Sequence, residues 1–167
     1  RLQGDWSSDV CSSDLLKSDA RALIPRPETE QLCETLATQA KDESCPWKRG
    51  RIADVGTGSG CIALALANAL PESSVVAFDA SDDALALARE NAKRCGLSSR
   101  VTFSKSDLLA AAEGEFDLIV ANLPYIPSSE IAALQPEVQR DPHTALDGGA
   151  DGFEDRKSRR LNSSHLV

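Results

Sequence analysis

Three glycines at alternate positions form the first stretch that could carry chemistry. They lie in residues 54–60, between the apolar pair Ile52-Ala53 and a helix-forming run at 61–67. This order predicts a strand, a tight turn and a helix. Glycine accepts positive φ and has no Cβ, so such a turn lets a ligand approach the backbone closely. We expect the first turn of the helix to aim N–H groups into the same space, and the stretch therefore predicts a ligand pocket.

Spacing narrows the choice of ligand. The dinucleotide fingerprint needs a glycine where Cys61 stands, and a P-loop needs a lysine that is absent here. What remains is a G-x-G-x-G turn followed by an acid at the end of the next predicted strand, where Asp79 can accept hydrogen bonds from ribose hydroxyls. S-adenosylmethionine is the natural candidate cofactor; the alternative is a structural turn and a surface aspartate. The predicted cofactor turn comprises Gly56, Thr57, Gly58, Ser59 and Gly60.

Two further residues follow the next predicted strand, at 101–103. Asp107 can accept a hydrogen bond from the exocyclic amine of an adenine, and Leu108 can cover the face of that ring. We therefore add both residues to the predicted cofactor site. The alternative is that both are ordinary turn residues.

A second chemical element, Asn122-Leu123-Pro124-Tyr125, follows the strand predicted at 116–121. Asn122 offers a carbonyl oxygen, and Pro124 holds Leu123 extended, so that the main-chain oxygen of Leu123 is fixed beside it. Two acceptors aimed at one point bind an NH2 group, and Tyr125 supplies a flat face against it. These four residues are the predicted catalytic site, and Asn122 is also counted in the predicted cofactor site. The acceptor is an exocyclic amine or a side-chain amide. The alternative is a turn that merely ends the strand.

The remaining pattern predicts an α/β fold with a doubly wound, mostly parallel sheet. Two prolines around Arg26 predict a stiff extended entry, which is either a helix stop or a wall of the site. Ser81 is the expected N-cap of the helix at 82–95, which buries Leu85 and Ala88. The other expected elements are helices at 31–40 and 61–70 and strands near 52–55 and at 74–79.

Composition bounds the function. The chain has 167 residues, 41% of them hydrophobic, and a net charge of -8, which argues against a nucleic-acid substrate. The cysteines show no C-x-x-C spacing, so we expect neither a zinc site nor another metal, but reduced thiols in a cytoplasmic protein. The sequence contains neither a run of 18 apolar residues nor a signal peptide. Nothing in it therefore predicts a location in or across a membrane.

Both ends of the chain differ in character from the interior. Residues 5–15 and 155–165 resemble in-frame translations of sequencing-adapter DNA, and the chain contains no methionine. We therefore expect residues 1–15 and 155–167 to be non-native, and residues 16–154 to be part of a catalytic domain. On this interpretation the basic cluster at 156–160 is no nucleic-acid patch.

Four segments in this order resemble the peptide-chain release factor glutamine methyltransferases: 23–30 (LIPRPETE), 54–60, 122–125 and 141–149 (DPHTALDGG). The resemblance implies a Rossmann-like class I fold that uses S-adenosyl-L-methionine. The substrate it implies is the glutamine of the Gly-Gly-Gln tip of release factors. By it, the glycine turn, Asp79 and Leu108 line the cofactor site, and residues 122–125 hold the glutamine amide.

The chain departs from this family in several ways. Leu123 replaces the usual first proline of Asn-Pro-Pro-Tyr, and Asp141 replaces the usual glutamate. The family's N-terminal helical domain and last strands are missing, so we expect a truncated, marginally stable and inactive piece of an enzyme. That enzyme is expected to be a monomer that acts on release factors without binding nucleic acid or membrane directly. The alternatives are an adenine-N6 methyltransferase on rRNA or DNA, and a non-functional chimeric fragment.

Overall fold

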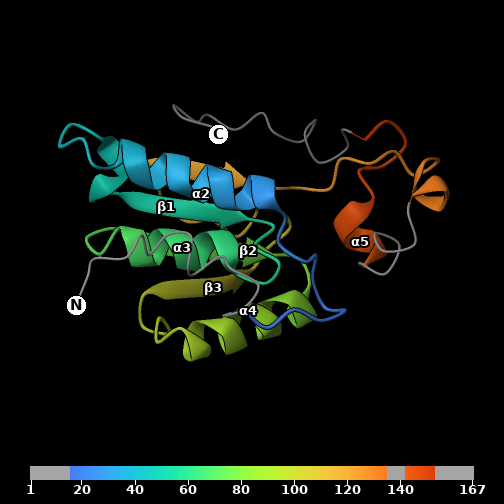
Figure 1. Ribbon diagram of the computed structural model, residues 1–167, viewed down its shortest axis with the longest axis horizontal. Helices are drawn as coiled ribbons and strands as arrows, with labels where there is room; N and C mark the ends of the chain where they lie inside the picture. Colours follow the sequence, from blue (N-terminus) through green and yellow to red (C-terminus); the bar gives the residue numbers. More distant parts are fainter. Residues whose placement is uncertain (1–15, 135–141, 153–167) are drawn as a thin grey trace.

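The computed structural model describes residues 16–134 and 142–152 of the chain (Figure 1). The predicted non-native ends, and Asp141, lie outside these residues. The helices are α2 (Pro27–Gln39), α3 (Cys61–Ala69), α4 (Asp82–Arg94) and α5 (His143–Leu146), with short 3-10 turns η1 (Pro46–Lys48) and η2 (Ile131–Ala133). The strands are β1 (Arg51–Val55), β2 (Ser74–Asp79), β3 (Val101–Lys105) and β4 (Leu118–Ala121).

The four strands form one parallel sheet in the order β3-β2-β1-β4. In the register of this sheet, Ile52 of β1 lies between Val75 of β2 and Leu118 of β4. The chain winds outward from β1 to β3 and then returns to the other side of β1 to form β4. A reversal of this kind opens a crevice at the carboxyl ends of the strands, which is where ligands bind in open α/β sheets.

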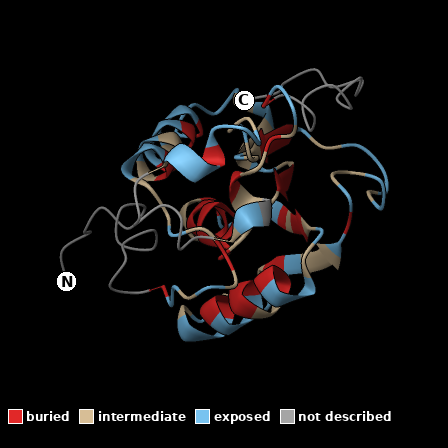
Figure 2. Ribbon diagram, turned by 90° about the vertical axis from the view of Figure 1, so that its right-hand side faces the viewer, coloured by how far each residue is buried: buried red, intermediate tan, exposed pale blue. Residues whose placement is uncertain are grey.

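Three helices lie along one face of the sheet (Figure 1). α3 contacts β1, β2 and β3, α4 contacts β2 and β3, and α2 packs beside α3. α3 is buried along most of its length because neighbours surround it, and its alanine-rich run suits such close packing (Figure 2). On the other face, the link between β3 and β4 supplies Phe116, which meets Phe78 edge to face at 6.0 Å.

α4 shows how far local pattern sets this fold. The Ser81 hydroxyl accepts a hydrogen bond from the Ala84 N–H at 3.2 Å, so the predicted N-cap is confirmed. The predicted inner face is buried, but so are Leu87 and Asn91. The reason is that the segment 16–22 covers a second side of α4, where Ala22 packs with Leu87.

Three predicted boundaries are wrong by more than one residue. α2 begins at Pro27 and not at residue 31, because proline is well tolerated in the first helical turn. β3 continues to Lys105, since a polar end is acceptable on a strand paired on one side only. β4 begins at Leu118, because Phe116 belongs to the link that packs on the sheet. The predicted bounds of β2 are confirmed.

Candidate functional site

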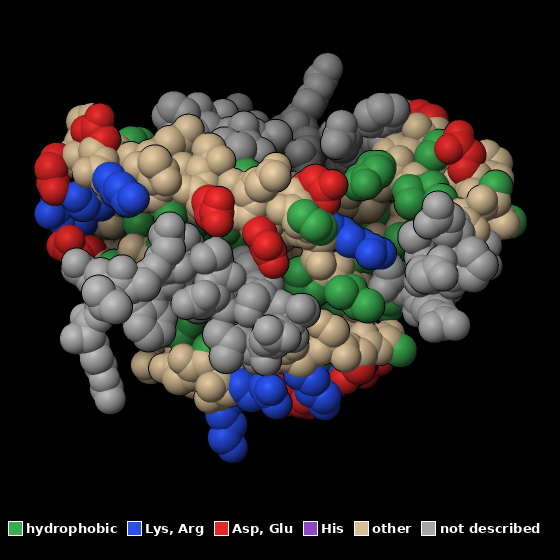
Figure 3. Space-filling view, in the orientation of Figure 1, with side chains coloured by type: hydrophobic (Ala, Val, Ile, Leu, Met, Phe, Trp, Pro, Cys, Tyr) green, Lys and Arg blue, Asp and Glu red, His purple; other side chains and the backbone are tan. Residues whose placement is uncertain are grey.

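A cavity of about 400 Å³ opens at the carboxyl ends of the strands. The glycine turn, the end of β2, the start of the β3–β4 link and the residues after β4 all contribute to its wall. Figure 3 shows hydrophobic side chains gathered on this side of the molecule, between the start of α2 and α5. The predicted residues that line the cavity are Gly56, Gly58, Asp79, Asp107, Leu108, Asn122, Leu123 and Pro124.

The glycine turn adopts the backbone conformation that its composition predicts. Gly56, Gly58 and Gly60 have φ of 72°, 55° and 85°. A Cβ at Gly56 would lie 2.8 Å from Leu123 Cδ2, so the turn and the residues after β4 touch directly at this point. Thr57, Ser59 and Gly60 are buried and do not line the cavity, so they shape the turn from inside.

Asp54, near the end of β1, binds the buried side of the glycine turn. Its carboxylate is fully buried and accepts hydrogen bonds from Thr57 Oγ1 at 2.6 Å and Ala63 N at 3.1 Å. Burial raises the pKa of Asp54 to about 6, because the charged form loses its water. Ala63 lies in the first turn of α3, and no residue of α3 lines the cavity. The first turn of α3 was expected to point its N–H groups at a ligand, but one of them, that of Ala63, donates to Asp54 instead.

Asp79 ends β2 at the edge of the cavity. Its Oδ2 accepts from Gly58 N and its Oδ1 from Ser81 N, both at 2.9 Å. The carboxylate is thus fixed between the glycine turn and the start of α4. A carboxylate has about four acceptor positions, so about two remain for hydroxyl groups in the cavity.

Asp107 and Leu108 begin the link between β3 and β4, and both line the cavity. Leu108 has φ of 50°, and it is the one non-glycine residue of the described ranges with positive φ. Such a backbone costs of order 1 kcal/mol and is common where a side chain must be aimed at a ligand. The sequence pattern gave no sign of this conformation.

Residues 122–125 lie across the cavity from Asp79. The Asn122 Nδ2 donates to the hydroxyl of Thr29 at 3.4 Å, while the side chain stays exposed. Leu123 is half-buried over Gly56, and Pro124 lines the cavity. Tyr125, the fourth predicted catalytic residue, is 63% exposed and does not line the cavity.

The segment 142–152 supports the residues after β4. Leu146 O accepts from Ile126 N at 3.1 Å, and Gly148 N donates to Ile126 O at 2.9 Å. Ser128 Oγ donates to Asp147 at 2.6 Å, which lowers the pKa of that carboxyl. Through these bonds, the short α5 is placed so that Ala145 forms part of the cavity wall.

The chain is similar in sequence to known proteins. Residues 27–141, more than two thirds of the chain, match the family described as methyltransferase small domain. The chain belongs to this family. It is 48% identical over 139 residues to the release factor glutamine methyltransferase of Deinococcus radiodurans, covering 83% of this chain and 48% of that protein. With the protein of the same name from Bradyrhizobium diazoefficiens the identity is 49% over 138 residues, covering 82% and 46%.

The chain thus spans about half the length of the relatives it matches. Its fold is similar to that of the hMettl16 catalytic domain in complex with MAT2A 3'UTR hairpin 6. The TM-score is 0.67 at 18% identity, with 91% of this chain and 58% of that one covered. This similarity confirms the Rossmann-like class I methyltransferase fold. The predicted resemblance to the release factor glutamine methyltransferases is confirmed as a sequence relationship.

The cavity fits S-adenosyl-L-methionine, the cofactor that the family implies. A Cβ added at Gly58 would lie 3.6 Å from the Cβ of Ala22. A side chain at position 58 would therefore narrow the cavity. The Asp79 carboxylate has acceptor positions of the kind that hydroxyl groups need, and the Leu108 side chain is apolar; both residues line the cavity. The chemical character of the wall therefore matches a nucleoside with an amino-acid tail.

Sequence reasoning missed the segment that precedes α2. Arg21, Ala22 and Leu23 line the cavity, and Arg21 is paired with Asp19 and Glu90, both at 2.8 Å. The Arg21 guanidinium, together with the Lys17 ammonium, lowers the pKa of Glu90. The corner of two prolines around Arg26, predicted as either a helix stop or a wall of the site, does not line the cavity; the wall is formed by the residues just before it.

Asn91 was also missed, although it connects three parts of the site. Its Oδ1 accepts from Lys17 N at 2.8 Å, and its Nδ2 donates to Lys17 O at 3.0 Å and to Ser59 O at 2.9 Å. It is completely buried in α4. A buried asparagine in an amphipathic helix was the signal that could have revealed it.

Proposed function

We propose that residues 16–154 of this chain are part of the catalytic domain of an enzyme that methylates release factors. The reaction is transfer of a methyl group from S-adenosyl-L-methionine to the side-chain amide nitrogen of the glutamine in their Gly-Gly-Gln motif. The observation that supports this most is the contact between the glycine turn and the residues after β4, where Leu123 Cδ2 lies against Gly56. A cofactor on the turn and an amide held by Asn122 would meet at this contact. The names of the relatives favour a release factor as substrate.

The cofactor-binding role belongs to one wall of the cavity. Gly56 and Gly58 admit the amino-acid tail because they carry no side chains, and Asp79 accepts from the ribose hydroxyls. Asp107 accepts from the adenine amine and Leu108 packs on the ring. Thr57, Ser59 and Gly60 keep the turn in shape from the buried side. When bound, S-adenosyl-L-methionine supplies a methyl group on a positively charged sulfur.

The acceptor role belongs to the opposite wall. The side-chain oxygen of Asn122 and the main-chain oxygen of Leu123 each accept a hydrogen bond from one N–H of the glutamine amide. Tyr125 packs on the plane of this amide. An amide nitrogen is a weak nucleophile because its lone pair is delocalised. The site therefore works by orientation and by stabilising positive charge that develops on the N–H bonds. Once the N–CH3 bond has formed, the amide nitrogen carries an extra proton, which passes to water.

The enzyme is proposed to act as a monomer. Its proposed location is the cytoplasm, where release factors act. Among the described residues, no helix combines the length and the apolar character needed to cross a bilayer. The negative net charge of the chain favours a protein substrate over a bare phosphate backbone.

A chimera tests the proposed function. The matched residues of the Deinococcus radiodurans relative are replaced by the corresponding residues of this chain, which restores the parts that the chain itself does not span. Tritiated S-adenosyl-L-methionine is then supplied with a release factor, with its Gln→Ala variant in the motif, or with an adenine-containing RNA. We expect label on the glutamine only, and loss of transfer with retained cofactor binding in Asn122→Ala.

Two results would contradict the proposal. Label on adenine would favour the adenine-N6 alternative, and undiminished transfer by Asn122→Ala would remove the acceptor role of that residue. Cofactor binding by the chimera, measured in parallel, shows that it is folded when transfer is assayed.

A further inference from the structure

Thr29 is the residue that contacts the Asn122 side chain. The Asn122 Nδ2 donates to Thr29 Oγ1 at 3.4 Å, across 93 residues of sequence. Thr29 lies in the first turn of α2 and is 7% exposed, whereas Asn122 is exposed at the mouth of the cavity. An exposed amide is thus held by a buried hydroxyl.

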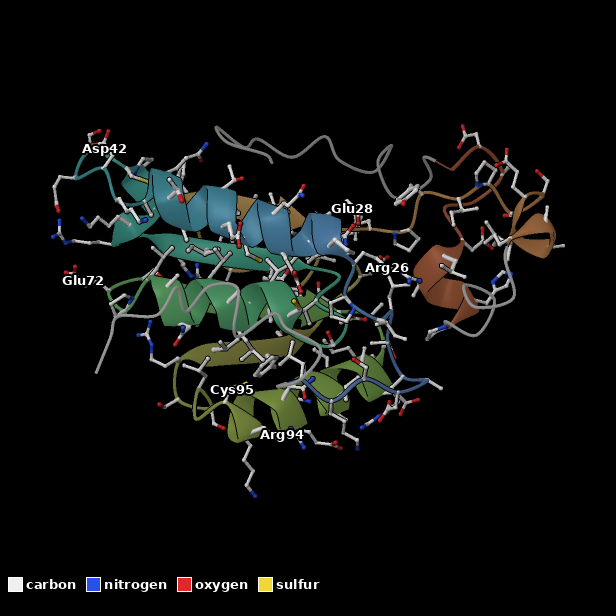
Figure 4. The ribbon with its side chains drawn as sticks, in the orientation of Figure 1. Arg26, Glu28, Asp42, Glu72, Arg94 and Cys95 are labelled. Atoms are coloured by element: carbon white, nitrogen blue, oxygen red, sulfur yellow. The ribbon has the colours of Figure 1, made fainter. Side chains whose placement is uncertain are left out.

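The hydroxyl of Thr29 is itself well fixed. Pro27 begins the helix, and Thr29 N donates to Arg26 O at 2.9 Å, which closes the first turn. Thr29 then shares the buried face of α2 with Cys33 and Leu36, one and two turns along. A β-branched side chain has few χ1 choices in a helix, so packing and backbone together set the position of Oγ1. Figure 4 shows the neighbouring Arg26 and Glu28 at the same end of α2, far from Asp42 and Glu72.

The contact determines what Asn122 presents to the cavity. A carboxamide is planar, with its donor and acceptor on opposite sides of one carbon. When Nδ2 is bound to Thr29, Oδ1 must face away from α2. Among the described residues no group donates to Asn122 Oδ1, and the residue lines the cavity. The reverse orientation would present N–H donors, which cannot bind an NH2 group.

We propose that Thr29 is a positioning residue for Asn122: its hydroxyl accepts from the amide nitrogen and so presents the amide oxygen to the substrate. This proposal rests on the proposed function, since it assigns the orientation that an amide-binding oxygen needs. It gives the LIPRPETE segment a role in the site, although only Leu23 of that segment lines the cavity. α2 fixes the orientation of a side chain at the end of β4.

Two variants of Thr29 separate this role from packing. Thr29→Val keeps the shape and removes the hydroxyl, whereas Thr29→Ser keeps the hydroxyl and removes a methyl group. Thr35→Val is the matched control, because Thr35 is an exposed threonine of α2 whose hydroxyl donates to Gln31 O at 2.8 Å. Thr29→Ala replaces Thr29→Val if urea denaturation shows that the valine variant does not fold.

The first measurement uses the 167-residue chain and needs neither cofactor nor substrate. The Asn122 side-chain NH2 signals in a ¹⁵N–¹H NMR spectrum are identified by their loss in Asn122→Asp. We expect Thr29→Val to shift these signals, and Thr29→Ser and Thr35→Val to leave them in place. Unshifted signals in Thr29→Val, or equal shifts in Thr29→Ser, would overturn the proposal.

The second measurement uses the chimera described above. We expect Thr29→Val to lower kcat about fivefold, the effect of one lost hydrogen bond, with an unchanged KM for S-adenosyl-L-methionine. Thr29→Ser should restore kcat to within about twofold. An unchanged kcat in Thr29→Val would overturn the positioning role. If the parent chimera transfers no methyl group at all, the proposed function fails, and the NMR result alone decides whether Thr29 holds Asn122.

Discussion

The two walls of the cavity are built in different ways. On the cofactor side, Asp54, Asp79 and Asn91 each make two or more hydrogen bonds, and Asp54 and Asn91 are completely buried. On the acceptor side, Asn122 and Tyr125 are exposed, and main-chain bonds to the segment 142–152 support the residues that follow them. The side proposed to hold the cofactor is thus fixed by buried hydrogen bonds, whereas the side proposed to hold the acceptor presents exposed groups.

The largest expected effect tests the contact between the two sides. Gly56→Ala places a methyl group 2.8 Å from Leu123 Cδ2 on a backbone with φ of 72°. Gly96→Ala is a matched control, because Gly96 has φ of 70° and nothing within 4 Å of the added Cβ. We expect Gly56→Ala to lose about 3 kcal/mol of unfolding free energy and about 100-fold in cofactor affinity, and Gly96→Ala to lose about 1 kcal/mol alone. Urea denaturation and calorimetry measure the two quantities.

Equal losses of stability in the two glycine variants would show that backbone strain explains both. The contact between Leu123 and the glycine turn would then contribute nothing to the free energy of unfolding. The two walls of the cavity would not stabilise one another at this point.

Two asparagines provide the next test. Asn91→Ala leaves the carbonyls of Lys17 and Ser59 without a donor in a buried site, so we expect a loss of about 3 kcal/mol of unfolding free energy. Asn122→Ala removes an exposed group with one long hydrogen bond, so we expect a change within about 0.5 kcal/mol. Urea denaturation of both variants gives the comparison. Similar losses would mean that the two sides are equally rigid.

The pH dependence of stability tests Asp54. Because its folded pKa, about 6, lies above the ordinary aspartate value of 3.8, its contribution is fully present below pH 3.8 and is lost as the pH rises through 6. We expect the wild-type free energy of unfolding to fall by about 2 to 3 kcal/mol over this range relative to Asp54→Asn, which cannot titrate there. Urea denaturation at a series of pH values from 3.5 to about 7.5 measures it, and parallel curves for the two proteins would contradict the assignment.

The smallest expected effect is on the acceptor side. Ser128→Ala removes the hydrogen bond that lowers the pKa of Asp147, so that pKa should rise toward its ordinary value. A lowered folded pKa stabilises above the unfolded value, and this stabilisation is lost as the pH falls through it. Carboxyl ¹³C NMR of Asp147 measures the change. Ser129→Ala is the control, and an equal shift in both variants would exclude the bond as the cause.

Local pattern was sufficient for much of the fold. Ser81, the acids after it and the glycine after α4 predict that helix within one residue, because caps and side-chain periodicity act over a few positions. The spacing of Gly56, Gly58 and Gly60 predicted a turn with positive φ, and the structure confirms it. The order of the predicted strands and helices was enough to place their carboxyl ends at one edge.

Long-range contacts were not predictable in the same way. Asn91 meets Lys17 across 74 residues, and Asn122 meets Thr29 across 93, and neither pair has a local signature. The positive φ of Leu108, whose side chain packs against a cluster of buried hydrophobic residues, has no local signature either. The site residues themselves were predicted from type and spacing, and their ligand-binding roles stay predictions. What holds them in place required the structure.

Binding of S-adenosyl-L-methionine to the 167-residue chain tests the central claim most directly. Isothermal titration calorimetry of the wild type is compared with Asp79→Ala, which removes the carboxylate between Gly58 and Ser81. The account predicts one bound cofactor per chain and at least about tenfold weaker binding in the variant. No binding to a folded wild-type chain, or equal binding by the variant, would contradict it.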